Sequence, residues 1–347
     1  MEYTQLREML SALCPLPGPS GFERPVALRA AELLRPLVDE VSIDRMGNLI
    51  GVRRCGKPDA KRILLDAHLD EIGLIVIGAE EGFLRFRTIG GVDPRMLPDR
   101  EVTILTDPPL FGVVACLPPH VQKAGDEDKS VPIPDLFIDT GLTQEEAAVR
   151  IPAGTPCVFR DSCFPLGQRL MCGKSMDDRS CFVTLLRAVQ MLQEKTLDTD
   201  LYILGSTREE VSYGGAATAV WTVAPDCCVA VDVTHGRTPD SPKDKAYELG
   251  GGPVVGVGPN MTRWMTERMI AKAKSANIPV QYEVIAGASG TNGWDMQIAR
   301  EGIATSVLSL PLKYMHSPVE TLDLSDMESV AALLAAFVEG IGEEALA

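Results

Sequence analysis

The chain has 347 residues, 45% of them hydrophobic, and its 48 acidic against 33 basic residues give a formal net charge of −15. This length suits one large domain, or one large domain with a smaller one. The negative charge disfavours nucleic acids and anionic membranes as partners, and we find no local basic stripe that would offset it.

The N-terminal part predicts a helix and then a buried strand. Ser20 and Glu23 have the spacing of a capping box ahead of the apolar helical pattern PVALRAAELL. The segment RILLDAHLD, residues 62–70, is an apolar run that ends in charge, which predicts a central strand.

Cysteine usage and the N-terminal sequence both favour a cytoplasmic protein. The nine cysteines are an odd number and none forms a C-x-x-C pair, which argues against a disulfide framework or a thiolate zinc site. The start MEYTQLREML lacks a basic region followed by an apolar run, and no apolar stretch approaches the length of a membrane span.

The pattern changes between residues 71 and 165. EGFLRFRTIGG, REVTILTD and LFGVVACLPP are short β-like runs broken by Gly and Pro, and helical periodicity is nearly absent until TQEEAAVR. We therefore expect a small β-rich domain, residues 71–165, inserted into a larger domain formed by residues 1–70 and 166–347.

Helices and strands alternate in the rest of the chain. MDDRSCFVTLLRAVQMLQEK has helical spacing, residues 201–207 and 227–234 are strand-like, and residues 261–277 predict another helix. The strand-like runs IPVQYEVI and ATSVLSL follow. A last helix begins at a second capping-box spacing, Ser325 with Glu328. Such alternation is typical of the α/β class.

Three predicted strands end in acidic residues or histidine, in the segments LLDAHLD, ILGSTREE and VAVDVTH. Ligands of α/β proteins bind at the carboxyl ends of the strands. The chain has only four histidines, and two of them, His68 and His316, lie at or after a strand. The candidate ligand set is His68, Asp177, Asp178, Glu209, Glu210, Asp232 and His316.

Imidazole and carboxylate groups are typical ligands of zinc, cobalt and manganese. Their distribution over separate strand ends suits two ions about 3.5–4 Å apart that share one carboxylate. Each residue also has an ordinary explanation: a packed or exposed imidazole, acids that complement a helix dipole at Asp177 and Asp178, or a turn cap at Asp232. The metal interpretation is favoured because all of them fall where strands end or helices begin.

At these positions the sequence resembles the M42 metallo-aminopeptidases, the deblocking or glutamyl-aminopeptidase-like enzymes that form tetrahedral assemblies. PSGFE, DAHLDEIG, KSMDDRSC, TREEVSYGGA, AVDVTH and YMHSPVE occur in the order and spacing of that family. The resemblance covers roughly residues 5–340. It implies a mixed-sheet zinc-peptidase-like catalytic domain, an inserted β-barrel-like domain that dimerises, and a dodecamer built from dimers.

The resemblance also implies roles for individual residues. His68, Asp177 and Asp232 would hold one ion, and Asp177, Glu210 and His316 the other, so that Asp177 bridges two zinc, cobalt or manganese ions.

Two further carboxylates receive roles from the same resemblance. Glu209 would be the general base that deprotonates the water between the ions, a role worth about 10²–10⁴-fold in rate. Asp70 would orient the His68 imidazole. The implied activity is removal of N-terminal residues from peptides.

The expected substrate-binding segment departs from the family pattern. Thr291 is retained, Asn292 stands where the family usually has Asp, and Trp294 follows as either a pocket wall or a packed side chain. We expect these three residues to contact substrate.

Two other functions stay open from the sequence. One is a metal-free glycoside hydrolase that pairs Glu209 with Glu210 or Asp232. Adjacent residues of one strand point to opposite faces, which makes Glu209 and Glu210 an awkward pair. The other is a non-catalytic peptide-binding relative, suggested by the altered segment TNGWD.

Overall fold

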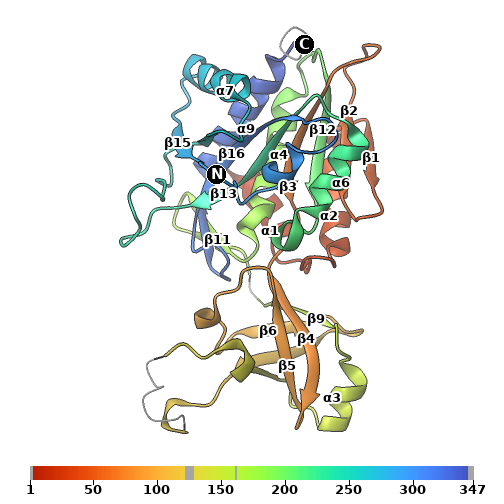
Figure 1. Ribbon diagram of the computed structural model, residues 1–347, viewed down its shortest axis with the longest axis vertical. Coiled ribbons are helices and arrows are strands. Elements are labelled where there is room, and N and C mark those ends of the chain that lie inside the picture. The colour runs from red at the N-terminus through yellow and green to blue at the C-terminus, as the bar shows by residue number, and fades with distance from the viewer. Residues whose placement is uncertain (1–2, 122–128, 161, 343–347) are drawn as a thin grey trace.

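The computed structural model describes residues 3–121, 129–160 and 162–342 (Figure 1). It consists of a large mixed sheet covered by helices and a closed six-stranded barrel. The predicted α/β class, with a mixed sheet and a small β-barrel, is confirmed.

The large sheet has eleven strands. In spatial order its main path runs through β1 (Glu40–Ile43), β2 (Leu49–Arg53), β12 (Asp200–Ser206), β3 (Arg62–His68), β13 (Cys227–His235), β16 (Ala304–Lys313), β17 (Glu320–Asp323), β11 (Leu170–Gly173) and β10 (Phe164–Leu166). Off this path, β14 (Val254–Val257) pairs with β16 and β15 (Gln281–Val284). The central strands β12, β3, β13 and β16 are parallel, so their carboxyl ends meet at one edge.

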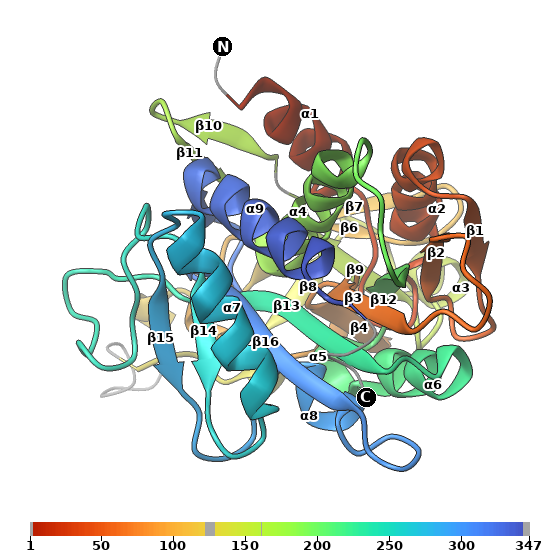
Figure 2. The ribbon, with the colours of Figure 1, turned by 90° about the horizontal axis from the view of Figure 1, so that it is seen from above.

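Helices cover both faces of this sheet (Figure 2). One face carries α1 (Thr4–Leu13), α2 (Arg24–Leu34), α4 (Met176–Leu192), α7 (Arg263–Ser275) and α9 (Leu324–Glu339). The other carries α6 (Gly214–Val223) and α8 (Gly293–Met296). Because both faces are covered, the parallel strands are buried and read as continuous apolar runs.

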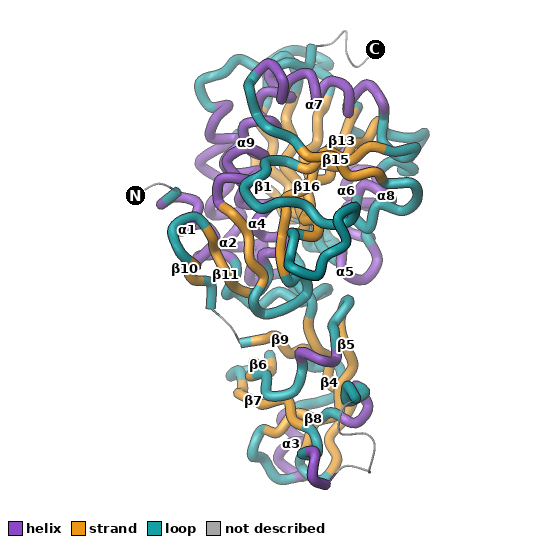
Figure 3. The backbone as a smooth tube through the Cα atoms, turned by 90° about the vertical axis from the view of Figure 1, so that its left-hand side faces the viewer, coloured by secondary structure: helices purple, strands orange, loops and turns teal. Residues whose placement is uncertain are grey.

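The barrel closes in the order β4 (Gly73–Glu80), β5 (Phe83–Ile89), β8 (Phe137–Asp139), β7 (Leu110–Ala115), β6 (Glu101–Ile104) and β9 (Pro156–Phe159). It has its own apolar core, and α3 (Gln144–Arg150) packs against it. Figure 3 shows the barrel extending away from the sheet domain. These strands lie within the expected insertion, residues 71–165, whose boundaries and dimerising role stay predictions.

Both predicted capping boxes are wrong. The N-cap of α2 is Glu23 rather than Ser20, whose hydroxyl instead donates to Asp70 Oδ2 over 2.6 Å. The N-cap of α9 is Asp323, whose carboxylate accepts from the Ser325 amide. The local pattern loses to a long-range contact at Ser20, and at Ser325 to an acceptor two residues earlier.

Within the described ranges, every helix is too short or too polar to cross a membrane.

Candidate metal centre

The predicted ligands gather at one place, the carboxyl edge of the parallel strands. His68 is the last residue of β3, where it pairs in register with Ser206 at the end of β12. A cavity of about 220 Å³ opens there. Its lining includes His68, Asp177, Glu209, Glu210, Asp232 and His316. Residues up to 248 positions apart in sequence, His68 and His316, thus share one cavity.

Asp177 lies between the two histidines. Its Oδ1 is 3.1 Å from His68 Nε2, and its Oδ2 is 3.4 Å from His316 Nε2. Burial alone would raise the pKa of Asp177, but both histidines hold it well below the ordinary value. Because each carboxylate oxygen faces a different imidazole, Asp177 has the arrangement that a bridging ligand requires.

The start of α4 presents Asp177 to the cavity. Ser175 has a left-handed backbone, with φ of 57°, and Asp177 itself is extended, with φ of −77° and ψ of 107°. The regular helix therefore begins only after Asp178. This agrees with the prediction that both acids lie at a helix start.

His68 is 2% exposed and is surrounded by carboxylates. Its Nδ1 is 3.1 Å from the carbonyl oxygen of Asp70 and 3.4 Å from Asp70 Oδ1. Burial would lower the pKa of His68, but Glu209, Asp177 and Asp70 raise it well above the ordinary value. This environment favours a positive charge at the ring, supplied by a proton or by a bound cation.

Glu209 and Glu210 do not lie on a strand, so the expectation that they alternate between the faces of a sheet is wrong. β12 ends at Ser206, Arg208 is left-handed with φ of 59°, and both glutamates begin the short helix α5 (Glu209–Ser212). Successive side chains of a helix are rotated by about 100°, so the two carboxylates still point in different directions.

Their contacts differ accordingly. Glu210 Oε2 is 3.3 Å from His316 Nε2, and Glu209 Oε2 is 3.8 Å from His68 Nε2. Burial raises the pKa of Glu209 to about 10, and the carboxylates of Asp232, Glu210 and Asp177 add to the rise. Without a bound cation, the cavity therefore does not stabilise the ionised form of all its carboxylates.

Asp70 lies behind the cavity and is fully buried. Its Oδ1 accepts from the Glu209 amide over 3.0 Å, and its Oδ2 accepts from the Glu210 amide over 3.2 Å. Together with its contact to His68 Nδ1, these hydrogen bonds let one carboxylate orient three residues of the cavity.

His316 is held by the barrel. Its Nδ1 is 2.8 Å from the carbonyl oxygen of Gly91, which follows β5. A Cβ atom built on Gly91 would lie 3.0 Å from the same nitrogen, so the close approach depends on glycine. The inserted segment thus orients one of the predicted ligands.

Three groups of side chains offer ligand atoms that all lie within 4.8 Å of one another: His68 with Glu209 and Asp232, His68 with Asp177 and Glu210, and Asp177 with Asp178 and Asp232. These groups overlap with the predicted division without reproducing it, and His316 joins them through its contacts with Asp177 and Glu210. The mixture of imidazole and carboxylate donors fits divalent zinc, cobalt or manganese.

Two further carboxylates hold the backbone of this region: Asp178, a candidate ligand to which the resemblance gives no role, and Glu320, which the sequence analysis did not identify. Asp178 Oδ2 accepts from the His68 amide over 3.2 Å. Glu320 accepts from the amides of Asp177 and His316. The only available signal was their presence in the segments KSMDDRSC and YMHSPVE, because the contacts themselves join distant parts of the chain.

The expected substrate-binding residues lie beside the cavity rather than in its lining. Asn292 is 2% exposed and donates through Nδ2 to Asp66 Oδ2 over 2.8 Å and to Ser206 Oγ over 2.9 Å. Thr291 is buried, and Trp294 lies in α8. The adjacent Gly290 does line the cavity. Contact of Thr291, Asn292 and Trp294 with substrate stays a prediction.

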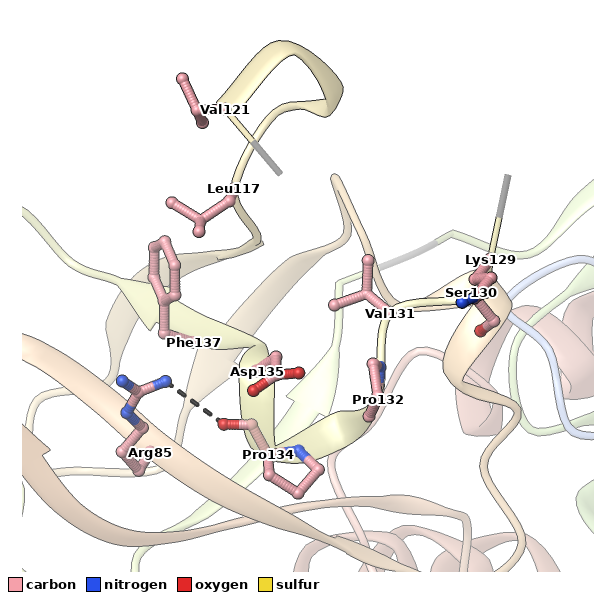
Figure 4. Close-up of a pocket in the computed structure, with 10 residues that line it drawn as sticks. All are labelled: Arg85, Leu117, Val121, Lys129, Ser130, Val131, Pro132, Pro134, Asp135 and Phe137. Atoms are coloured by element: carbon pink, nitrogen blue, oxygen red, sulfur yellow. Dashed lines mark hydrogen bonds between the residues drawn. The ribbon is translucent and has the colours of Figure 1, made fainter. Parts of the chain in front are cut away.

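A larger cavity of about 620 Å³ lies beside the barrel, lined in part by Arg85, Val131 and Phe137 (Figure 4). Its charged lining residues within the described chain are Arg85, Lys129 and Asp135, and it includes none of the candidate ligands. Ligand chemistry, rather than size, therefore identifies the candidate site.

Comparison with known proteins agrees with this geometry. A profile of the M42 glutamyl aminopeptidase family matches residues 47–333. The chain is 34% identical to the lysyl aminopeptidase of Pyrococcus furiosus, and the alignment covers 96% of each chain.

Solved structures give the same result. Aminopeptidase APDkam598 from the archaeon Desulfurococcus kamchatkensis superposes with a TM-score of 0.91 at 34% identity, covering 99% of this chain and 96% of that one. The TET1 peptidase of Pyrococcus horikoshii, which can assemble into a tetrahedron or a large octahedral shell, gives a TM-score of 0.84 at 30% identity over 97% and 100% of the two chains.

Proposed function

Because this chain belongs to the M42 glutamyl aminopeptidase family and is an aminopeptidase of that family, we propose that it removes N-terminal residues from peptides by two-metal hydrolysis. The observation that carries the two-metal proposal is Asp177, whose two oxygens face His68 and His316 over 3.1 and 3.4 Å.

In this proposal His68, Asp177 and Asp232 hold one divalent ion, and Asp177, Glu210 and His316 hold the other. The ions are zinc or cobalt, with manganese as a further candidate. When bound, such ions lower the pKa of a shared water and polarise the scissile carbonyl.

Glu209 is the proposed general base. It lines the same cavity and is 8% exposed, so that its carboxylate is shielded from bulk water. It takes a proton from the attacking water and returns one to the leaving amine. Asp70 keeps Glu209, Glu210 and the His68 ring in place through the hydrogen bonds described above.

Recognition of the N-terminus would involve the same cavity. We propose that the free α-amine of a peptide binds the second ion or a nearby carboxylate, which would restrict cleavage to the N-terminal residue. We propose that Thr291, Asn292 and Trp294 contribute to the preference for the first side chain.

The direct test uses the purified full chain. Dialysis against a chelator and then metal-free buffer should abolish cleavage of aminoacyl-anilides and short peptides, and added zinc, cobalt or manganese should restore it. Metal analysis of the active protein should give two ions per chain, and an N-acetylated peptide should resist cleavage. Full activity in excess chelator would refute the proposal, and hydrolysis of polysaccharide under that condition would support the carboxylate-pair alternative instead.

We also propose that the chain forms dimers through the barrel, residues 71–165, and a dodecamer built from them. Support comes from the similarity over 97% of the chain to the assembling TET1 peptidase. Twelve copies of the 37.4 kDa chain give about 449 kDa, which light scattering on a sizing column distinguishes from a dimer. A particle of dimer mass would refute the dodecamer.

A further inference from the structure

Glu320 joins two of the proposed ligands through their backbones. It is the first residue of β17 and is 2% exposed. Its Oε1 accepts from the His316 amide over 2.8 Å, and its Oε2 accepts from the Asp177 amide over 3.1 Å. One carboxylate thus connects the turn before β17 with the start of α4.

Both amides belong to backbone that has no regular partner of its own. His316 has a left-handed backbone, with φ of 60°, in the connection from β16 to β17. Asp177 lies in the first turn of α4, where amides have no acceptor within the helix. Each oxygen of the Glu320 side chain accepts from one of these amides, so Glu320 stabilises both conformations.

We propose that Glu320 is a positioning residue that sets the separation of Asp177 from His316, and thereby the affinity of the metal pair. This inference rests on the two-metal function proposed above. Asp177 Oδ2 lies 3.4 Å from His316 Nε2, and Glu320 accepts from the backbone amides of both residues. Glu320 itself is absent from the cavity lining and contacts no reacting atom.

The proposal predicts an unequal effect on the two ions. His316 belongs only to the ion that it shares with Glu210, whereas Asp177 is common to both. Loss of Glu320 should therefore weaken the ion at His316 and Glu210 more than the ion at His68 and Asp232.

Asp326 provides a matched control. It is also a buried carboxylate, 1% exposed, that accepts from two backbone amides, those of Gly250 over 2.7 Å and Gly252 over 2.8 Å. None of these three residues lines the cavity. Asp326→Asn reproduces the loss of a buried double acceptor without touching the site.

The test compares Glu320→Gln and Asp326→Asn with the parent, each as the full chain. A glutamine keeps the shape of Glu320 but has one acceptor oxygen for two amides. We expect zinc titration of the chelator-treated Glu320→Gln protein, followed by equilibrium dialysis and metal analysis, to show dissociation constants raised about 10–100-fold. At zinc concentrations between the two dissociation constants, the Glu320→Gln protein should retain one ion per chain. The Asp326→Asn protein should bind zinc as the parent does.

Glu320→Asp, which keeps the carboxyl group but shortens the side chain by one methylene, provides a second variant if Glu320→Gln does not fold, and we expect the same loss of the ion at His316. Parental zinc affinity in a folded Glu320 variant, or an equal loss in Asp326→Asn, would overturn the inference. Absence of zinc binding by the parent would instead refute the two-metal function, so the two failures are distinguishable.

Discussion

Replacement of Glu209 by glutamine should abolish turnover and at the same time stabilise the metal-free protein. The change preserves shape and removes the proposed base, so we expect kcat to fall about 10²–10⁴-fold. Two metal ions should stay bound, because Glu209 is not assigned to either of them. Substitution of a residue that serves catalysis at the expense of stability commonly lowers activity and raises the free energy of unfolding.

The stabilisation follows from the pKa of Glu209, which burial raises from 4.5 to about 10. Below pH 4.5 the carboxyl is protonated in both the folded and the unfolded protein, so it contributes nothing. As the pH rises above 4.5 only the unfolded chain releases the proton, and folding becomes less favourable until the pH reaches about 10. A neutral glutamine removes this dependence.

The magnitude at pH 7 follows from the same values. This pH is about 2.5 units above 4.5, and each unit corresponds to about 1.4 kcal/mol. The metal-free Glu209→Gln protein should therefore be more stable than the parent by at most about 3–4 kcal/mol at pH 7, and by less where neighbouring carboxylates share the repulsion.

Urea unfolding of the chelated proteins at pH 4.5 and pH 7, together with anilide cleavage by the metal-loaded proteins, measures both effects. Glu328→Gln is a suitable control, because Glu328 pairs with Arg187 and does not line the cavity. Parental turnover in Glu209→Gln would disprove its role as base. A metal-free variant less stable than the parent at pH 7 would disprove the electrostatic argument.

Three further substitutions test the surroundings of the site. Glu210→Ala should lower metal content from two ions towards one per chain, measured by metal analysis; unchanged content would contradict its assignment as a ligand. Asp70→Asn leaves one acceptor oxygen for the amides of Glu209 and Glu210, and we expect about 10–100-fold lower kcat/KM; a parental value would show that these amides need no carboxylate. Gly91→Ala would place a methyl 3.0 Å from His316 Nδ1 and should weaken zinc binding in titration, whereas parental affinity would show that the ring moves without cost.

Several features of the candidate site could be predicted because they depend on local pattern. The apolar runs that end in His68 and Asp232 are buried parallel strands, and the carboxyl ends of such strands meet at one edge of the sheet. Asp177 was correctly expected at a helix start. Each of these predictions needs only the sequence within about ten residues.

Other features could not be predicted because they depend on contacts across the fold. The two glutamates form a helical turn rather than continuing β12, and their amides are held by Asp70, 139 and 140 positions earlier. Ser20 donates to the same Asp70 instead of capping the helix that follows it. A capping pattern gives no information about a stronger acceptor that approaches from a distant segment.

The sequence by itself determined the α/β class, the central strands β3, β12, β13 and β16, the helices α4, α7 and α9, and which imidazole and carboxylate groups lie where strands end or helices begin. Only the tertiary structure decided how these groups are held: Asp177 lies between two histidines, His316 lies against Gly91 of the inserted segment, and Glu320 of β17 accepts from the amides of His316 and Asp177. The physical reason is that the hydrophobic periodicity of a segment predicts which of its side chains are buried, and this needs only the sequence of that segment. The orientation of a ligand depends on hydrogen bonds whose donors and acceptors meet only after the chain has folded.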